Sequence, residues 1–238
     1  MCALGTKCSI VLNGHKERSL IVSAIKSVEL GISEIKKPNK CTFDLILVLD
    51  SADEQTLELT QDAISKLSLQ TSLTFVNYSD LGEARNYGVK YSNSDWIVFL
   101  DGDDLVGPNW LNTISENIDK IDPTTVYHPA YLIYFGNSSR IHHQCAFNEL
   151  SNIDLIKLAT VTNPWGSPLL AHKTLLLENP YERSDKLNHL GYEDWAFNRS
   201  TLDKGIRHYC LNDTFYLIRD RSESLSKITT SNYYFPIS

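Results

Sequence analysis

The stretch 96-WIVFLDGDDLVGPNWL-111 sets an apolar run directly against a cluster of acids. Residues 96–100 are all apolar, which is the composition of a buried strand, and Asp101, Asp103 and Asp104 follow at once. Carboxylates packed this closely repel one another, so the arrangement is costly unless a cation or a hydrogen-bonding ligand lies among them. The stretch therefore predicts a strand that ends at a binding site.

The residues before this stretch alternate between apolar runs and helical periods. The runs at 8–13, 43–50, 72–77 and 95–101 predict buried strands, and the segments 17–30, 53–67 and 82–92 have the period of amphipathic helices. This alternation predicts an α/β fold with a Rossmann-like, mostly parallel sheet flanked by helices. Ligands of such sheets gather at the carboxyl ends of the strands, where Asn13, Asp50 and Asp101 stand.

The βαβ order loosens after Asp104. A helix with Pro108 in its first turn is expected over 108–120, and a strand over 124–135. The other patterned segments are 153–159, 168–179, a helix over 193–204, and 206–221. No internal repeat, low-complexity segment or linker divides the chain. We therefore expect one domain over 1–238, with a regular half at 1–104 and an irregular half at 105–238.

Composition excludes several classes of protein. The formal net charge of -7 disfavours a nucleic-acid partner, because nucleic-acid binding depends on basic contacts to phosphate. The five cysteines are scattered and form no C-x-x-C pair, which argues against a disulfide framework or a zinc site. No signal peptide is recognisable, and no apolar stretch approaches the roughly 20 residues of a transmembrane helix. These features predict a cytoplasmic protein.

Asp101 and Asp103 flank Gly102, which lets the backbone turn sharply so that both carboxylates can approach one ligand. Hard oxygen ligands of this kind suit Mg²⁺ or Mn²⁺, which complete their coordination with water and substrate phosphates. The structural alternative is a solvated Asp/Gly turn. The position of these two aspartates directly after a fully apolar strand favours the metal site.

Two residues of the first half have both a functional and a structural interpretation. The Asp50 carboxylate can accept hydrogen bonds from a base or a ribose, or it can cap the following helix, where Ser51 and Asp53 would serve equally well. Arg85, on the expected helix 82–92, can contact a phosphate or a base, but an arginine on a helix is more often solvated.

The second half offers three further groups of candidate residues. Glu193 and Asp194 stand at an expected helix start, where acids are ordinary partners of the helix dipole, but one of them could serve as a general base. Arg219 and Arg221 suit phosphate groups, and a surface loop explains them as well. Trp165 can stack on a sugar ring or fill the core.

In this order and spacing, 82-GEARNYGV-89, 98-VFLDGDD-104 and 191-GYEDW-195 resemble the family 2 glycosyltransferases of the GT-A fold, over nearly the whole chain. The resemblance implies that 1–104 binds a nucleotide-sugar and that 105–238 supplies the acceptor site and the catalytic base. The first segment, VLNGHKER, and the second, LDSADEQT, depart from the Tyr-Asn and D-D-G-S patterns common in that family.

On the donor side, the resemblance implies that Asp103 ligates Mn²⁺ or Mg²⁺ and that Asp101 contacts the ribose or reaches the metal through water. Asp50 would hydrogen-bond the uracil of a UDP-sugar, and Arg85 would lie against the base or the phosphates. The other implied nucleotide-sugar contacts are Asn13, Glu17, Gly102, Arg219 and Arg221. No His-x-x-Arg follows the last strand, so no third metal ligand is assigned.

On the acceptor side, Asp194 would deprotonate the accepting hydroxyl, and Glu193 and Trp165 would contact acceptor or sugar. The resemblance thus implies an inverting, metal-dependent hexosyl- or N-acetylhexosaminyltransferase that acts on a glycan or lipid-linked acceptor in bacterial surface polysaccharide synthesis. Peripheral association with the inner face of the membrane fits this context. A non-catalytic glycan- or partner-binding module of the same fold, or a phosphatase or nucleotidyltransferase that uses the D-x-D carboxylates, is the alternative.

Overall fold

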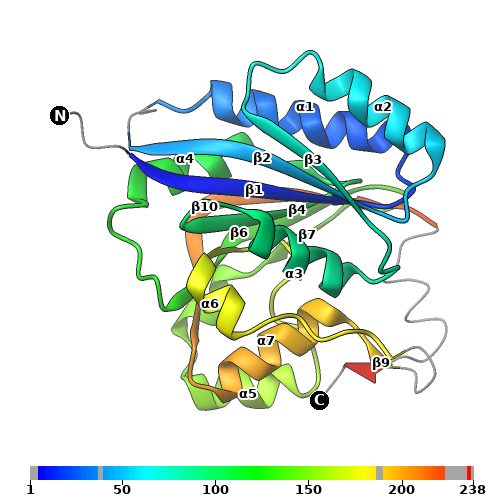
Figure 1. Cartoon of the computed structure of the whole chain (residues 1–238). Helices are drawn as coiled ribbons and strands as arrows, with labels where there is room; N and C mark the ends of the chain where they lie inside the picture. Colours follow the sequence, from blue (N-terminus) through cyan, green and yellow to red (C-terminus); the bar gives the residue numbers. More distant parts are fainter. Residues whose placement is uncertain (1–4, 37–39, 186–189, 223–234, 237–238) are drawn as a thin grey trace.

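The computed structural model describes residues 5–36, 40–185, 190–222 and 235–236. Its centre is a nine-stranded sheet with the order β3-β2-β1-β4-β8-β6-β10-β5, and β7 pairs with β6 (Figure 1). The strands of this sheet are β1 (Thr6–Gly14), β2 (Cys41–Asp50), β3 (Thr71–Val76), β4 (Trp96–Asp101), β5 (Leu105–Val106), β6 (Thr125–Gly136), β7 (Arg140–His143), β8 (Leu170–His172) and β10 (Arg207–Asp220). A separate pair joins β9 (Leu190–Gly191) to β11 (Phe235–Pro236).

The first four strands are parallel and confirm the expected runs. β1 lies between β2 and β4, and β3 flanks β2 at the edge of the sheet. Asn13 of β1 is the Cα partner of Asp101 of β4, and Asp50 is the last residue of β2. The polar strand ends therefore meet at one edge of the sheet, as the sequence predicted.

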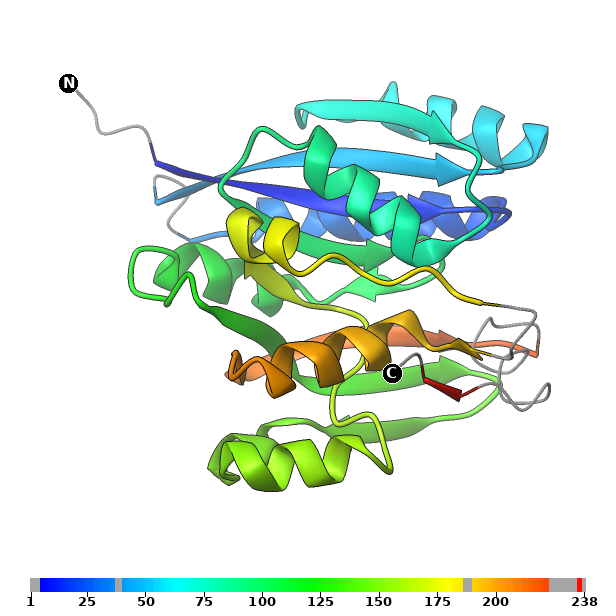
Figure 2. The ribbon, with the colours of Figure 1, turned by 60° about the horizontal axis from the view of Figure 1, so that its bottom comes forward.

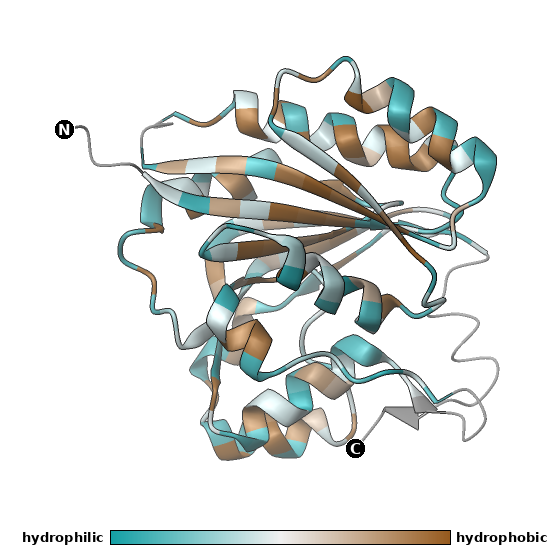
Figure 3. Cartoon of the chain, viewed as in Figure 1, coloured by the Kyte–Doolittle hydropathy of each residue, from teal (hydrophilic) through white to brown (hydrophobic). Residues whose placement is uncertain are grey.

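Helices cover both faces of the sheet (Figures 1 and 2). One face packs against α1 (Ser19–Ser33), α2 (Glu54–Ile64) and α4 (Pro108–Asn117), and the other lies under α3 (Leu81–Tyr91), α6 (Lys173–Glu178) and α7 (Glu193–Asp203), with α5 (Asn152–Ala159) against α7. A short 3₁₀ turn, η1 (Cys145–Glu149), precedes α5. The strands form the hydrophobic centre, whereas the outer helix faces are hydrophilic (Figure 3).

The second half is more regular than its pattern indicated. β6 and β10 run parallel over most of their length, and the short antiparallel β8 joins β6 to β4. The apolar segment 168–179 is thus divided between the strand β8 and the helix α6. The α/β fold class with a mostly parallel sheet is confirmed.

In the described part of the chain, Cys8, Cys41, Cys145 and Cys210 are free thiols. None of the helices in these residues has both the length and the apolar character needed to cross a membrane.

Candidate active site

Arg85 is a buried residue that links Asp101, at the end of β4, to Glu193, at the start of α7. It belongs to α3, which begins after Asp80, whose side chain accepts a hydrogen bond from Glu83 N. Its guanidinium is 0% exposed, and donates from Nη2 to Asp101 Oδ1 and from Nη1 to Glu193 Oε1, each over 2.8 Å. The end of β4 and the start of α7 are therefore held together by one buried cation.

This position corrects the expected role of Arg85. The guanidinium carbon lies 5.3 Å from the ring centroid of Tyr181 and 5.8 Å from that of Phe99, inside the core. A side chain without exposed surface is not available to a base or a phosphate. Arg85 instead positions two carboxylates that are themselves near the ligand edge.

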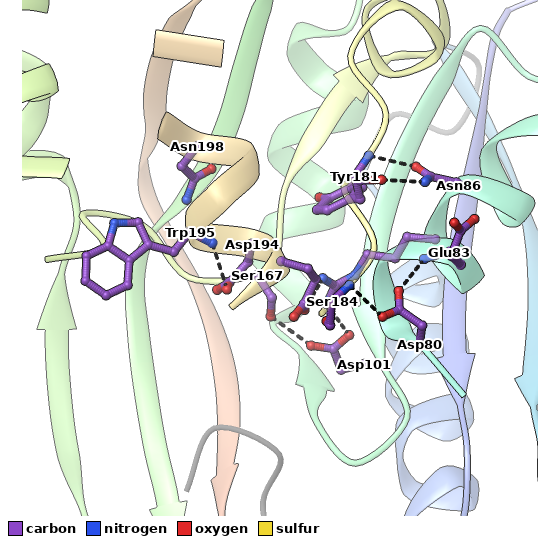
Figure 4. Close-up of polar contacts among 12 residues, drawn as sticks. Asp80, Glu83, Asn86, Asp101, Ser167, Tyr181, Ser184, Asp194, Trp195 and Asn198 are labelled. Carbon is purple, nitrogen blue, oxygen red and sulfur yellow. Dashed lines mark hydrogen bonds and ion pairs between the residues drawn. The ribbon is translucent and has the colours of Figure 1, made fainter. Parts of the chain in front are cut away.

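Asp101 is held from two sides. Besides Arg85 on Oδ1, its Oδ2 accepts a hydrogen bond of 2.8 Å from Ser167 Oγ (Figure 4). Both oxygens therefore have a protein partner, and the carboxylate retains 21% side-chain exposure. The arrangement suits a carboxylate that reaches a ligand or a bound water better than one that ligates a metal directly.

Gly102 brings two strand ends into contact. Its N–H donates to the Asn13 carbonyl over 2.8 Å, and a Cβ atom at position 102 would lie only 2.8 Å from that oxygen. The same Cβ would lie 3.3 Å from Cγ of Glu17, so the β1–α1 loop is packed against the D-x-D turn. The glycine is needed for this close approach.

Asp103 lies beside two arginines, Arg219 of β10 and Arg221, which follows the end of that strand. Arg221 Nη2 lies 2.8 Å from Asp103 Oδ2, and Arg219 Nε donates to the Asp103 carbonyl over 2.9 Å. Burial raises the pKa of Asp103, and Arg221 opposes that shift. Arg219 and Arg221 thus lie at the D-x-D turn, as the phosphate hypothesis requires.

The side chains at this turn could bind a divalent cation only if a substrate phosphate also coordinated it. Within the described residues, no group of three or more His, Cys, Asp or Glu side chains could hold a metal ion by itself. Asp104 is buried and accepts the backbone N–H of Arg219 over 2.7 Å, so it serves the fold. Asp103 is the remaining carboxylate with an open side, and Mg²⁺ or Mn²⁺ can be bound by one or two carboxylates together with substrate phosphates.

Asn13 and Glu17 border the same turn from the β1 side. The Asn13 side chain is buried at 4% exposure, and neither its Nδ2 nor its Oδ1 atom has a hydrogen-bond partner. Glu17 accepts a hydrogen bond from His15 N, and burial raises its pKa. Because buried amides are normally satisfied, the orphaned amide of Asn13 is the group here that most needs a ligand.

Asp50 has a structural role that neither interpretation anticipated. Its two oxygens accept three hydrogen bonds of 2.8 to 2.9 Å from the backbone N–H groups of residues 78–80, and Ser51 Oγ adds a fourth of 3.0 Å. Asp53, not Asp50, caps α2 by accepting from Thr56 N. Asp50 therefore fixes the loop that leads into α3.

Glu193 and Asp194 open α7 at the same edge. Burial raises the pKa of Glu193 to about 7, with Arg85 opposing the shift and Asp194 adding to it. Burial also raises the pKa of Asp194, one of whose oxygens accepts from Trp195 N over 2.8 Å (Figure 4). The other oxygen accepts from Asn163 Nδ2 over 3.1 Å. A carboxylate with a raised pKa, held in place but not ion-paired, can act as a general base.

The segment 163–167, which precedes β8, joins these groups, and apart from Trp165 the sequence analysis named none of its residues. Its first residue donates to Asp194 and its last to Asp101, while Gly166 N donates to Gln144 Oε1 over 2.7 Å. The Asn-Pro and Gly-Ser pairs mark a loop. Nothing local to the sequence indicates that its two ends reach different carboxylates of one site.

Trp165, in the middle of this segment, belongs to the core. Its ring is 1% exposed and stacks on His208 at 4.4 Å and His128 at 5.2 Å between centroids. Its expected contact with a sugar is therefore corrected, because no ring surface is open.

Comparison with known proteins agrees with this geometry. A family model described as glycosyl transferase family 2 matches residues 9–179, from β1 to the end of α6. The chain is also 22% identical over 225 residues to an uncharacterised glycosyltransferase, the MG060 homolog of Mycoplasma pneumoniae, covering 92% of this chain and 71% of that protein.

Solved structures share the fold. The chain superposes on Staphylococcus aureus TarS 1–349 in complex with UDP-GlcNAc with a TM-score of 0.67 at 20% identity, over 92% of this chain and 60% of that one. The mannosyltransferase PcManGT of Pyrobaculum calidifontis, in complex with GDP-Man and Mn²⁺, gives a TM-score of 0.63 at 15% identity, over 94% and 59%. This chain therefore spans about three fifths of these solved chains.

Proposed function

The chain belongs to glycosyl transferase family 2, whose model matches residues 9–179, and from this premise we propose that it is an inverting glycosyltransferase that moves a sugar from a nucleotide-sugar to a hydroxyl group. The observation that carries the proposal is the buried guanidinium of Arg85, which joins Asp101 of the D-x-D turn to Glu193, the neighbour of Asp194. Donor-side and acceptor-side carboxylates are thereby held at one edge of the sheet.

The donor binds across the half 1–104. The unpartnered amide of Asn13 contacts the nucleotide, Glu17 and Gly102 border it, and Asp101 reaches the ribose with the oxygen surface that Arg85 and Ser167 leave open. Arg221 and Arg219 lie beside the diphosphate, where guanidinium groups bind phosphate oxygens. UDP is the proposed nucleotide, with Asp50 positioning the neighbouring loop.

Asp103 would hold Mg²⁺ or Mn²⁺ together with the diphosphate. When bound, such a cation neutralises the negative charge that grows on the departing diphosphate. The ion pair of Asp103 with Arg221 favours the charged carboxylate and opposes the burial that raises its pKa. A charged Asp103 is the form that can bind a cation.

Asp194 takes the proton in one displacement. The acceptor hydroxyl gives its proton to the Asp194 carboxylate, its oxygen forms a bond to the anomeric carbon, and the bond from that carbon to the diphosphate oxygen breaks with its electron pair. Asn163 and the Trp195 N–H orient the base, and Glu193 beside it contacts acceptor or sugar. A single displacement inverts the anomeric centre. The half 105–238 thus supplies the acceptor site.

We further propose that the acceptor is a glycan or a lipid-linked saccharide of a bacterial surface polysaccharide and that the reaction takes place in the cytoplasm, at the inner face of the membrane. The transferred group would be a hexose or an N-acetylhexosamine. The similar proteins of Mycoplasma pneumoniae and Staphylococcus aureus come from bacteria, which supports this context.

The test has two steps. Thermal unfolding is measured with UDP, GDP, CMP and ADP, each with and without Mn²⁺, and then release of the nucleoside diphosphate is measured from UDP-GlcNAc, UDP-Glc and GDP-Man. Stabilisation by UDP that requires Mn²⁺, followed by turnover of a UDP-sugar, is the expected result. Nucleotide binding without turnover of any donor would favour a non-catalytic module of the same fold.

A further inference from the structure

One face of the β6–β7 hairpin is turned toward the active site. Antiparallel Cα partners point to the same face of a sheet, and Leu132 is paired with His142 and Tyr134 with Arg140. His142 Nε2 lies 3.3 Å from the carbonyl oxygen of Pro164, so this face is turned to the 163–167 segment. Arg140 stands two residues before His142 on the same strand and therefore points to the same face.

Arg140 also lies at the catalytic edge of the sheet. Its partner Tyr134 stands near the carboxyl end of β6, one residue before Phe135, which is the Cα partner of Arg219 on β10. Burial raises the pKa of the Tyr134 phenol and Arg140 lowers it, while the negative charges of Asp104 and Asp194 raise it further. Tyr134, on which Arg140 stacks, is thus within electrostatic reach of the proposed base.

The guanidinium of Arg140 is exposed and built onto an aromatic support. Its carbon lies 4.0 Å from the centroid of the Tyr134 ring. None of the ion pairs among the described residues involves Arg140. Stacking occupies the flat face of the guanidinium, and a side-chain hydrogen bond to the Tyr134 hydroxyl takes part of its N–H edge. The remaining N–H groups of the fork can bind the oxygens of a phosphate or a carboxylate.

The acidic residues around the site would oppose binding of an anionic acceptor unless a cation lies nearby. Carboxylates crowd the edge from the D-x-D turn to the start of α7, and the whole chain has a formal net charge of -7. This field repels an anionic acceptor, so an acceptor of that kind needs a local cation on the side of the base.

We propose that Arg140, stacked on Tyr134, binds an anionic group of the acceptor, a phosphate or a carboxylate close to the hydroxyl that receives the sugar. The inference rests on the proposed function, because it assigns the acceptor class of the same site. It adds a specificity-determining residue on β7, outside both the D-x-D turn and α7.

The experiment compares matched acceptors with the donor fixed as the one that the wild type turns over. The pairs are N-acetylglucosamine 1-phosphate with methyl N-acetylglucosaminide, and methyl glucuronide with methyl glucoside. The wild type is expected to favour an anionic member about 10- to 100-fold in kcat/KM, the factor that charge-assisted hydrogen bonds contribute. The phosphate and carboxylate pairs separate the two possible anions.

Two arginine variants and one control decide the assignment. R140Q should lose the preference for the anionic acceptor, and R140K, which keeps the charge without the fork, should retain part of it. R207Q is the matched control, because Arg207 also stacks on an aromatic ring, Tyr209 at 5.4 Å, but at the beginning of β10. Calorimetric binding of UDP reports whether each variant retains its donor site.

Each outcome supports or overturns a distinct statement. A preference that R140Q retains, or equal kcat/KM for charged and neutral acceptors in the wild type, overturns the role of Arg140 and leaves the proposed function standing. A wild type that binds UDP but turns over no donor overturns the proposed function as well. Loss of the anionic preference in both R140Q and R207Q would show a general charge effect and would also refute the assignment.

Discussion

Arg85 Nη1 lies 2.8 Å from Glu193 Oε1, and this ion pair joins residues 108 positions apart in the chain. The same guanidinium holds Asp101 at 2.8 Å, so a single buried cation determines the spacing of the acids on β4 and α7. Burying such a charge is costly without partners, and both carboxylates provide them. The contact makes the D-x-D turn and the proposed base parts of one site.

The first prediction concerns the base. Asp194→Asn keeps the shape of the side chain and one of its two acceptor oxygens, but it removes the carboxylate that takes the proton. We expect transfer to fall by roughly 10²- to 10⁴-fold, the usual contribution of general-base catalysis, with UDP affinity unchanged. Release of UDP from the donor and calorimetric UDP binding measure the two effects.

Asp203→Asn is the matched control, because Asp203 is an exposed acid at the other end of α7. It should leave both transfer and binding as in the wild type. Substantial transfer by Asp194→Asn would remove Asp194 from the role of base and would direct attention to Glu193.

The second prediction concerns the metal-binding acid. Asp103→Ala removes the carboxylate of the turn that has an open side, so UDP should no longer bind more tightly with Mn²⁺ than without it. In the wild type, UDP at about 100 times its dissociation constant should add roughly 2.7 kcal/mol to the free energy of unfolding. Thermal unfolding with UDP, with and without Mn²⁺, measures the difference.

Asp62→Ala is the comparison variant, since Asp62 also forms an ion pair, with Lys66 at 2.6 Å, but on the exposed surface of α2. Its response to UDP and Mn²⁺ should match that of the wild type. If Asp103→Ala keeps the full response to Mn²⁺, the cation is held elsewhere.

The third prediction is a dependence of stability on pH. Burial raises the pKa of Glu193 from an ordinary value of 4.5 to about 7, so the folded protein keeps a proton that the unfolded chain releases. The resulting stability is fully present below pH 4.5 and is lost as the pH rises through about 7. Glu193→Gln cannot ionise and still offers Arg85 an oxygen.

Thermal unfolding of both proteins from pH 4.5 to 8 tests this sign. The free energy of unfolding of the wild type should fall relative to that of Glu193→Gln as the pH rises from 4.5 to about 7. The difference should level off at the upper end of the measured range. Parallel curves would mean that Glu193 ionises as freely in the folded protein as in the unfolded chain.

The sequence predicted the parts of this site that local patterns determine. The apolar run before Asp101 and the polar residue at the end of β1 follow from strand composition and from the rule that parallel strands end at one edge. Helix α7 and its two acids follow from helical period.

Contacts between residues far apart in the chain could not be predicted from such local patterns. Whether an arginine on α3 is solvated or buried depends on which acids the fold brings beneath it, and for Arg85 these come from β4 and α7. Ser167 reaches Asp101 from a loop 66 positions away, and no periodicity records such a contact. The structural role of Asp50 was not predicted, because its partners are backbone N–H groups of residues 78–80, which have no signature in the sequence.

The last prediction concerns the orphaned amide of Asn13. Leaving a buried polar group without a partner costs about 1 to 3 kcal/mol, so Asn13→Ala removes a penalty as well as some packing. We expect the free energy of unfolding without ligand to stay level or to rise, while UDP affinity falls about tenfold through the loss of one hydrogen-bonded contact.

Asn86 offers the opposite case, because its amide donates to Tyr181 O over 2.8 Å and accepts from Tyr181 N over 2.9 Å. Asn86→Ala should therefore lower the stability of the unliganded protein. Opposite signs for these two buried asparagines would show that Asn13 is retained for a ligand, whereas a loss of stability in Asn13→Ala with unchanged UDP affinity would make it a residue of the core.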